Sequence, residues 1–136
     1  MMSDNKELTL VILAGGQSTR FGRIKQLEPL DRYGNTIMDY SIYDAAKFGI
    51  TKIAMVTHST LVREMQKHIK ERFADRIVVE YVLQDELAND YVSRGKPLGT
   101  GHALWCVKNT VKSPMIVINA DDFYGISAFQ KMAGHL

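Results

Sequence analysis

The sequence has 136 residues, of which 46% are hydrophobic and 24% are charged, and this composition is typical of one compact globular domain. Lys and Arg exceed Asp and Glu by 17 to 15. The resulting net charge of +2 excludes the strongly basic footprint of a nucleic-acid or membrane-surface partner and favours small-molecule partners. The single cysteine, Cys106, excludes an internal disulfide and fits a reducing compartment.

The first predicted element is an apolar run at residues 8–14. This run follows a polar segment without a basic leader, and it is far shorter than the roughly 20 apolar residues that span a bilayer. We therefore interpret it as a strand. The chain is predicted to be a cytoplasmic protein without a membrane partner, with one domain over residues 1–136.

A helix and a second strand are predicted next. Thr36 stands three residues before Asp39, an arrangement typical of a helix N-cap, and Gly49 is a typical helix stop. The β-branched run at residues 52–57 is the second predicted strand. The aromatic residues of this region are interpreted as core or interface side chains rather than stacking platforms: Tyr33, Tyr40, Tyr43 and Phe48.

A second helix is predicted to open at Thr60, because apolar residues then recur every four positions along one stripe: Leu61, Met65, Ile69 and Phe73. His68 is expected on the exposed or flanking side of this helix without a metal role, since the histidines of the chain show no zinc-site spacing. The remaining predicted elements are a strand at residues 77–83, a helix at 101–108, a strand at 114–120 and a helix at 127–133.

This alternation of strands and helices predicts an α/β fold. All four apolar runs are too continuous for strands with one solvent face, so they are typical of buried strands in a parallel sheet. The order predicts a Rossmann-like, open, mostly parallel sheet with helices on both faces. The connections at residues 17–35 and 84–98 are long and polar, and loops of this length inside a compact domain are typically functional.

The first candidate site is a glycine loop that directly follows the first strand. Two glycines let backbone amides approach phosphate oxygens, and Arg20 adds bidentate positive charge. The alternative is a tight turn with a solvated arginine. Neither a Walker-type loop nor the dinucleotide fingerprint fits the glycine spacing. The candidate residues are Leu13, Ala14, Gly15, Gly16, Gln17, Ser18, Thr19 and Arg20.

The second candidate site is a pair of carboxylates, Asp121 and Asp122, at the end of the strand predicted over residues 114–120. Mg²⁺ takes hard oxygen ligands, commonly one or two carboxylates together with substrate phosphates. An aspartate at a strand end therefore suits a magnesium site that bound nucleotide completes. The alternative is an Asp pair that caps the following helix or turn.

The glycine loop resembles that of the sugar-phosphate nucleotidyltransferases, which have a GT-A-like α/β fold. Their signature is approximately Leu-Ala-Ala/Gly-Gly-x-Gly-Thr-Arg, followed by a lysine, and here the lysine is Lys25. The segment Lys25-Gln26-Leu27-Glu28-Pro29 is similar to that of the thymidylyltransferases. Ser18 replaces the third glycine and the interval from Arg20 to Lys25 is short. Both features are also similar to molybdenum-cofactor guanylyltransferases, so the subclass stays open.

The resemblance implies roles for individual residues. Arg20 and Lys25 would act on the triphosphate, and Asp121 would bind the metal. Gln84 would read the base, with UTP or dTTP favoured, because an amide offers both a donor and an acceptor to a pyrimidine edge. The alternative is that Gln84 is a surface residue and the Gly-Thr-Gly segment a helix entrance. The base-reading segment comprises Gly99, Thr100 and Gly101.

The implied reaction is nucleotidyl transfer with Mg²⁺ as cofactor. A phosphate oxygen of a sugar 1-phosphate or similar acceptor attacks the α-phosphorus of a nucleoside triphosphate, and pyrophosphate leaves. The resemblance covers only the amino-terminal part of the family, so we expect a truncated GT-A-like domain without the acceptor pocket, inactive alone and compatible with a homo-oligomer. The alternatives are a non-catalytic nucleotide-binding module, a molybdenum-cofactor or cytidylyl-type transferase, and a dinucleotide-type redox domain.

Overall fold

The chain folds as the predicted alternation of strands and helices. The computed structural model describes residues 8–14, 27, 29–84, 104, 107, 111, 114–120, 122 and 131, together with the backbone of residues 19, 20, 23 and 24. In chain order the elements are β1 (Thr9–Leu13), β2 (Thr19–Arg20), β3 (Arg23–Ile24), α1 (Ile37–Ala46), β4 (Lys52–Thr57), α2 (Val62–Phe73), β5 (Val78–Leu83) and β6 (Met115–Asn119).

The main sheet has four strands in the order β5-β4-β1-β6, and every pairing within it is parallel. From β1 the chain moves outward through β4 to β5 and then returns to the other side of β1 at β6. The direction of winding therefore reverses between β1 and β6. Open α/β sheets bind their ligands beyond the carboxyl ends of the strands at such a reversal. The predicted parallel, Rossmann-like sheet is confirmed.

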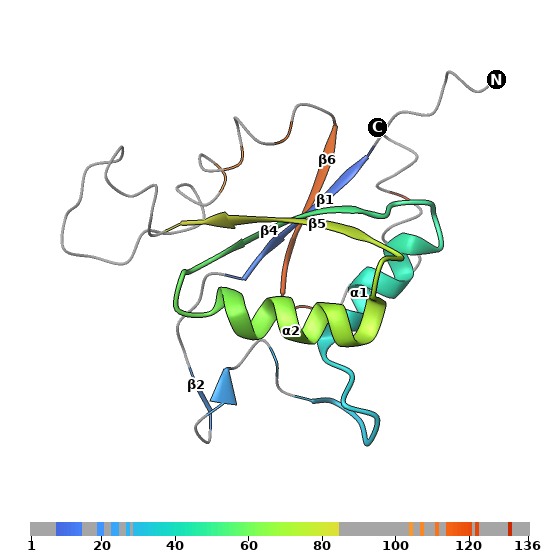
Figure 1. The fold of residues 1–136 in the computed structure, drawn as a ribbon. Helices are drawn as coiled ribbons and strands as arrows, with labels where there is room; N and C mark the ends of the chain where they lie inside the picture. Colours follow the sequence, from blue (N-terminus) through green and yellow to red (C-terminus); the bar gives the residue numbers. More distant parts are fainter. Residues whose placement is uncertain are drawn as a thin grey trace.

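Helices cover both faces of the sheet, as predicted. Figure 1 shows α1 and α2 on one face. Residues of the connection between β5 and β6 cover the opposite face. In this connection Leu104 and Val107 are helical, and the Val111 amide donates to the Val107 carbonyl over 2.9 Å. The buried side chains of this second face are Val11, Ala54, Val56, Val82, Val107 and Val111.

The larger core lies between the sheet and the two helices α1 and α2. Because side chains alternate along a strand, every second residue of β1, β4 and β6 points to this face. Each fully buried aliphatic side chain stabilises the fold by roughly 1.5–3 kcal/mol, so the central strands are strongly held. The principal members are Leu10, Ile12, Met38, Ile42, Ile53, Met55, Met65, Ile69, Phe73, Ile116 and Ile118.

The outer strands are less buried than the sequence predicts. Val78 on β5 is 66% exposed and Glu80 is exposed too, while Val117 on β6 is 38% exposed. The prediction of a fully buried strand is therefore wrong for β5. Val78, Glu80 and Val82 share the sheet face opposite α1 and α2, and of these three only Val82 belongs to the buried cluster of that face.

Helix α1 begins and ends where its sequence predicts. The Thr36 hydroxyl accepts from the Asp39 amide over 3.1 Å, and the Asp39 carboxylate accepts from the Thr36 amide over 2.9 Å, which together form a capping box. At the other end Gly49 has φ +78°, a left-handed conformation that glycine adopts without strain, and its amide donates to the Ala46 carbonyl.

Helix α2 begins at Val62, two residues later than predicted from Thr60. The amides of Leu61 and Val62 both donate to the His58 carbonyl, so the chain makes a turn before the helix proper. The apolar stripe is confirmed. Met65, Ile69 and Phe73 are buried, and the Phe73 ring packs on Tyr43 with 4.8 Å between centroids.

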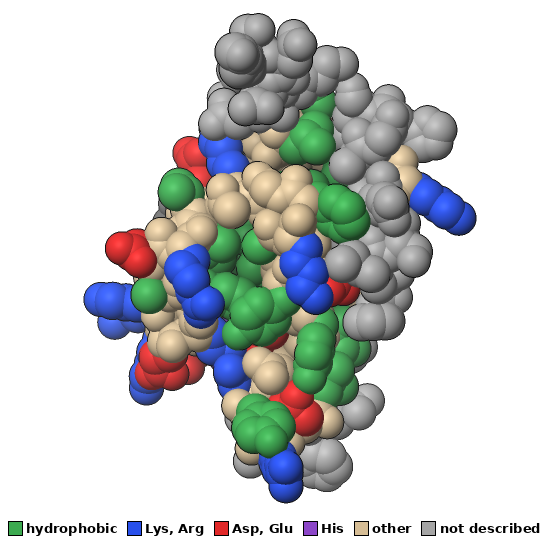
Figure 2. All heavy atoms as spheres, turned by 90° about the vertical axis from the view of Figure 1, so that its right-hand side faces the viewer, with side chains coloured by type: hydrophobic (Ala, Val, Ile, Leu, Met, Phe, Trp, Pro, Cys, Tyr) green, Lys and Arg blue, Asp and Glu red, His purple; other side chains and the backbone are tan. Residues whose placement is uncertain are grey.

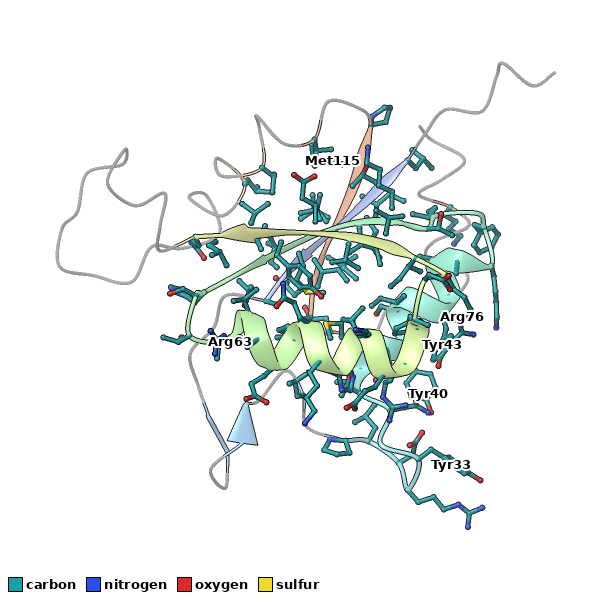
Figure 3. All side chains as sticks on the ribbon, in the orientation of Figure 1. Tyr33, Tyr40, Tyr43, Arg63, Arg76 and Met115 are labelled. Atoms are coloured by element: carbon teal, nitrogen blue, oxygen red, sulfur yellow. The ribbon has the colours of Figure 1, made fainter. Side chains whose placement is uncertain are left out.

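The aromatic residues around α1 divide into two groups. Tyr43 is a packing residue, as predicted. Tyr33 and Phe48 are 67% and 38% exposed, so they are not core residues, and for them the interface interpretation stays a prediction. Figure 3 shows Tyr33 on the turn that precedes α1, away from the helix residues Tyr40 and Tyr43. The Tyr33 ring contacts the neighbouring Arg32 guanidinium, whose central carbon lies 5.1 Å from the ring centroid.

The predicted loop at residues 17–35 contains regular structure. β2 and β3 pair antiparallel, with Thr19 opposite Ile24 and Arg20 opposite Arg23. The connection at residues 84–98 lies outside the described residues apart from Gln84. Within the described part of the chain, no helix is long and apolar enough to cross a membrane. On the face drawn in Figure 2, basic and acidic side chains are interspersed.

A buried ionic network joins α1 to α2. Asp39 is fully buried, and His68 Nε2 lies 2.9 and 2.8 Å from its two carboxylate oxygens. Arg72 Nε lies 3.2 Å from Asp39 Oδ2. His68 thus occupies the flanking position that the sequence predicts. A buried carboxylate is tolerated only when it is paired and hydrogen-bonded, and Asp39 meets both conditions.

Arg72 extends the same network to the turn before α1. It donates to the Asn35 side-chain oxygen over 3.1 Å and to the Tyr33 carbonyl over 2.6 Å. Gly34, between these two residues, has φ +81°, and a Cβ there would meet Arg72 Nη2 at 2.5 Å. Only glycine therefore combines this backbone conformation with the close approach of the guanidinium group.

Asp31 in this turn has a depressed pKa that yields a testable prediction. The Tyr40 hydroxyl donates to its carboxylate and lowers the pKa of Asp31 from 3.8 to about 2, with hydrogen bonds from Asn35 and the Tyr33 amide adding to the effect against partial desolvation. Since the folded-state pKa is below the ordinary value, Asp31 stabilises the fold above pH 3.8, and this contribution is lost as the pH falls towards about 2.

Replacing Tyr40 by phenylalanine should therefore raise the pKa of Asp31 towards its ordinary value. The pH dependence of stability below pH 3.8 should become shallower in the variant. The measurement is an NMR titration of the Asp31 carboxyl carbon, with the exposed Asp75 as internal reference. A pKa for Asp31 that is the same in both proteins would contradict the assignment.

Candidate functional site

The carboxyl ends of β1 and β6 lie side by side at the winding reversal. Leu13 pairs with Asn119, and the Ala120 amide donates to the Leu13 carbonyl over 3.1 Å. The glycine loop follows Ala14, and Asp121 follows Ala120. Two of the three segments singled out in the sequence therefore leave the sheet from neighbouring strands at the edge where ligands bind.

The end of β1 is held from its other side by β4. The Ala14 amide donates to the Val56 carbonyl over 2.7 Å, and the Thr57 hydroxyl donates to the Ala14 carbonyl over 3.0 Å. Ala14 is 1% exposed and Thr57 is fully buried. The sequence analysis missed Thr57. Its only signal is a hydroxyl residue at the end of an apolar strand, which many threonines share.

Gln84 stands at the same edge, directly after β5. Its amide donates to the Thr57 carbonyl over 2.8 Å, and the residue is only 4% exposed. The alternative that Gln84 is a surface residue is therefore wrong. Following the alternation along β5, Gln84 belongs to the same face as Val82, which is the face that Leu13 and Asn119 share across the sheet.

Polar groups gather at the end of β6. Asn119 Nδ2 donates to Asp122 Oδ2 over 3.1 Å, and the Asp122 amide lies 3.4 Å from the Asn119 carbonyl. Asp122 is exposed. Amide and carboxylate oxygens are hard donors of the kind that Mg²⁺ takes, so the side-chain types of Asn119 and Asp122 fit this ion. The described residues alone hold no group of three or more His, Cys, Asp or Glu side chains suited to a metal.

Several predicted site residues lie outside the described residues, so their roles remain predictions. For Thr19 and Arg20 only the backbone is described, as strand β2. The helix predicted over residues 101–108 is confirmed at Leu104 and Val107, and that predicted over 127–133 at Lys131. The undescribed site residues are Gly15, Gly16, Gln17, Ser18, Lys25, Gly99, Thr100, Gly101 and Asp121.

Known proteins resemble this chain over most of its length. The UTP–glucose-1-phosphate uridylyltransferase of Bacillus subtilis strain 168 is 27% identical over 126 residues, covering 82% of this chain and 43% of the relative. The bifunctional protein GlmU of Methanococcus maripaludis strain C7 is 30% identical over 114 residues, covering 82% of this chain and 24% of the relative. The chain thus spans less than half the length of these curated relatives.

Solved structures share the fold. A putative glucose-1-phosphate thymidylyltransferase from Bacillus anthracis, in complex with a sucrose, superposes with a TM-score of 0.70 at 20% identity over 93% of this chain and 50% of that one. HddC from Yersinia pseudotuberculosis, complexed with GMP-PN, gives a TM-score of 0.65 at 21% identity over 93% of this chain and 53% of that one.

A family model described as nucleotidyl transferase matches residues 9–136, which is nearly the whole chain. This match agrees with the parallel sheet, its winding reversal and the position of the glycine loop after β1. The chain belongs to the nucleotidyl transferase family.

Proposed function

We propose that this chain forms the nucleotide-binding part of an enzyme that transfers a nucleoside monophosphate from a nucleoside triphosphate to a sugar 1-phosphate or a similar phosphate acceptor. The observation that carries the proposal is the pairing of Leu13 with Asn119 at the winding reversal. It supports a site in which the phosphate-binding loop after β1 and the acidic residue after β6 act on one ligand.

The triphosphate would be held by the loop after β1. Amides from Gly15 to Thr19 donate to its oxygens, and Arg20 adds a bidentate guanidinium. Lys25 would interact with the reacting phosphates. An oxygen of the acceptor phosphate forms a bond to the α-phosphorus while the bond from that phosphorus to the bridging oxygen breaks, and pyrophosphate carries away the electron pair. Positioning and charge neutralisation supply the catalysis, without a covalent enzyme intermediate.

Asp121 is the residue that we propose to bind Mg²⁺. When bound, the ion neutralises charge on the phosphates and helps to orient them. The Asn119 side chain, which donates to Asp122, restrains the neighbouring carboxylate at the same strand end. This arrangement supports a division of roles in which Asp121 binds the ion and Asp122 shapes the turn that follows β6.

The base would be read by Gln84 together with Gly99, Thr100 and Gly101. The burial of Gln84 at the carboxyl edge supports this role, because a buried amide side chain presents a fixed donor and acceptor. The amide oxygen can accept from the N3–H of uracil or thymine while the amide nitrogen donates to a ring carbonyl, so UTP or dTTP is the favoured substrate. The name of the B. subtilis relative, a UTP–glucose-1-phosphate uridylyltransferase, agrees with this preference.

A thermal-shift panel tests the proposal. We expect UTP or dTTP with Mg²⁺ to raise the melting temperature more than CTP, GTP, ATP or NAD. A ligand present at 100 times its dissociation constant stabilises the folded state by about 2.7 kcal/mol, which is readily detected. Removing Mg²⁺ should reduce the shift. Stabilisation by NAD alone, or by no nucleotide, would contradict the proposal.

A further inference from the structure

Thr57 connects the two predicted nucleotide-binding segments that the described residues place at the carboxyl edge. Its side-chain hydroxyl donates to the Ala14 carbonyl over 3.0 Å, and its main-chain carbonyl accepts from the Gln84 amide over 2.8 Å. The residue lies at the end of β4, between β1 and β5. Thr57 therefore hydrogen-bonds to Ala14, before the phosphate loop, through its side chain. It hydrogen-bonds to Gln84, the predicted base-reading residue, through its backbone.

The bond to Ala14 acts on the last described residue before the glycine loop. The Ala14 carbonyl belongs to the peptide group that Ala14 shares with Gly15. A peptide group is planar and trans, so a bond that fixes its carbonyl also fixes the direction of its N–H. That N–H is the first glycine amide of the predicted phosphate-binding loop. Thr57 can thus orient a phosphate donor without contact with the nucleotide.

Among the described residues, the group that hydrogen-bonds to the Ala14 carbonyl is a side chain, the Thr57 hydroxyl. The Ala14 amide is held by Val56. The hydroxyl of Thr57 occupies the Ala14 carbonyl instead, and it does so inside the protein, where both residues are 1% exposed or less. In such surroundings a hydrogen bond is stronger and more directional than in water.

We propose that Thr57 is a positioning residue for triphosphate binding, which acts through the Ala14 carbonyl. This inference rests on the proposed function. The two hydrogen bonds of Thr57 can be tested separately. A side-chain substitution removes the bond to Ala14 but leaves the backbone bond to Gln84. Loss of the hydroxyl should therefore weaken the binding of every triphosphate equally and leave the preference between bases unchanged.

The test compares Thr57→Val, Thr57→Ala and Thr57→Ser in the full chain, with calorimetric dissociation constants for UTP, dTTP, CTP, GTP and ATP in Mg²⁺. Thr57→Val and Thr57→Ala should bind each triphosphate about tenfold more weakly, a change of the size expected for one hydrogen bond. Thr57→Ser keeps the hydroxyl and should stay within about threefold of wild type. The ranking of the bases should be the same in all variants.

Thr9→Val is the matched control. Thr9 is a buried threonine, 1% exposed, at the amino end of β1, whereas Ala14 follows the carboxyl end of that strand. Thr9→Val removes a buried hydroxyl from the same sheet and so tests whether a general loss of sheet stability weakens triphosphate binding. We expect the dissociation constants of this variant to equal those of wild type. A fall in affinity for Thr9→Val equal to that for Thr57→Val would overturn the positioning role.

The remaining outcomes separate this inference from the proposed function. If the wild-type chain binds no triphosphate, the proposed function fails. If wild type binds and either hydroxyl-free variant binds equally well, only the role of Thr57 fails. Alanine is smaller than threonine, so Thr57→Ala also tests the loss of the hydroxyl if Thr57→Val does not fold. A changed base ranking would also overturn the inference, since the effect would then reach Gln84.

Discussion

Replacing Asp121 by alanine is expected to abolish the Mg²⁺-dependent part of triphosphate binding while the melting temperature of the ligand-free protein stays within about 2 °C of wild type. Asp121 follows Ala120 at the end of β6, where the neighbouring strand β1 leads into the glycine loop. A carboxylate that shares its metal with substrate phosphates contributes to binding when nucleotide and ion are both present, and little to the stability of the free fold.

The measurement for Asp121 is isothermal titration with UTP and dTTP in the presence and absence of Mg²⁺. Asp122→Asn tests the adjacent carboxylate, and we expect it to retain most of the Mg²⁺-dependent affinity. Asp75→Ala is the matched control, because Asp75 is an exposed aspartate beyond the end of α2. Mg²⁺-dependent binding that survives in Asp121→Ala would remove this residue from the proposed metal site.

Replacing Arg72 by methionine is expected to lower the free energy of unfolding by about 3 kcal/mol, since breaking a buried ion pair costs on this order. The substitution leaves the fully buried Asp39 carboxylate with the Thr36 amide and His68 but without its guanidinium partner. It also removes the bonds from Arg72 to Asn35 and to the Tyr33 carbonyl. The turn before α1 then loses its tie to α2.

Urea denaturation of the ligand-free chain measures this loss. Arg63→Met is the matched control, because Arg63 is an exposed arginine of the same helix and lies at the opposite end of α2 from Arg76 (Figure 3). A surface change of this kind shifts stability by no more than about 0.5 kcal/mol. Equal losses of unfolding free energy in the two variants would show that the bonds of Arg72 to the network around Asp39 contribute no more stability than an exposed arginine does.

The elements of the fold were predictable because their signals are local. The capping box of Thr36 and Asp39 and the stripe of Met65, Ile69 and Phe73 each depend on residues within a few turns of one helix. Burial was less predictable. Val78 and Tyr33 are exposed because of where their elements lie in the molecule. The identity of an apolar or aromatic residue does not by itself tell whether its position is at the surface or in the core.

The candidate site was predictable in part. The glycine loop and Asp121 were found because each follows an apolar strand, and ligands bind at strand ends. Thr57 was not found, because it makes its bond to a residue 43 positions away. Asp39 was recognised as a cap, but its hydrogen bond with His68, 29 positions away, was not. A hydrogen bond across such a separation leaves no periodic pattern in the chain.

The sequence by itself determined the alternation of strands and helices, the parallel sheet and the residue types that suit phosphate, base and metal. Those properties follow from hydrophobic periodicity, helix caps and side-chain chemistry. Only the tertiary structure decided that β6 lies beside β1 rather than at the far edge beyond β5. That choice depends on which faces of the sheet the connecting helices cover, and it brings the end of the phosphate-loop strand beside the end of the strand that carries the acidic residues.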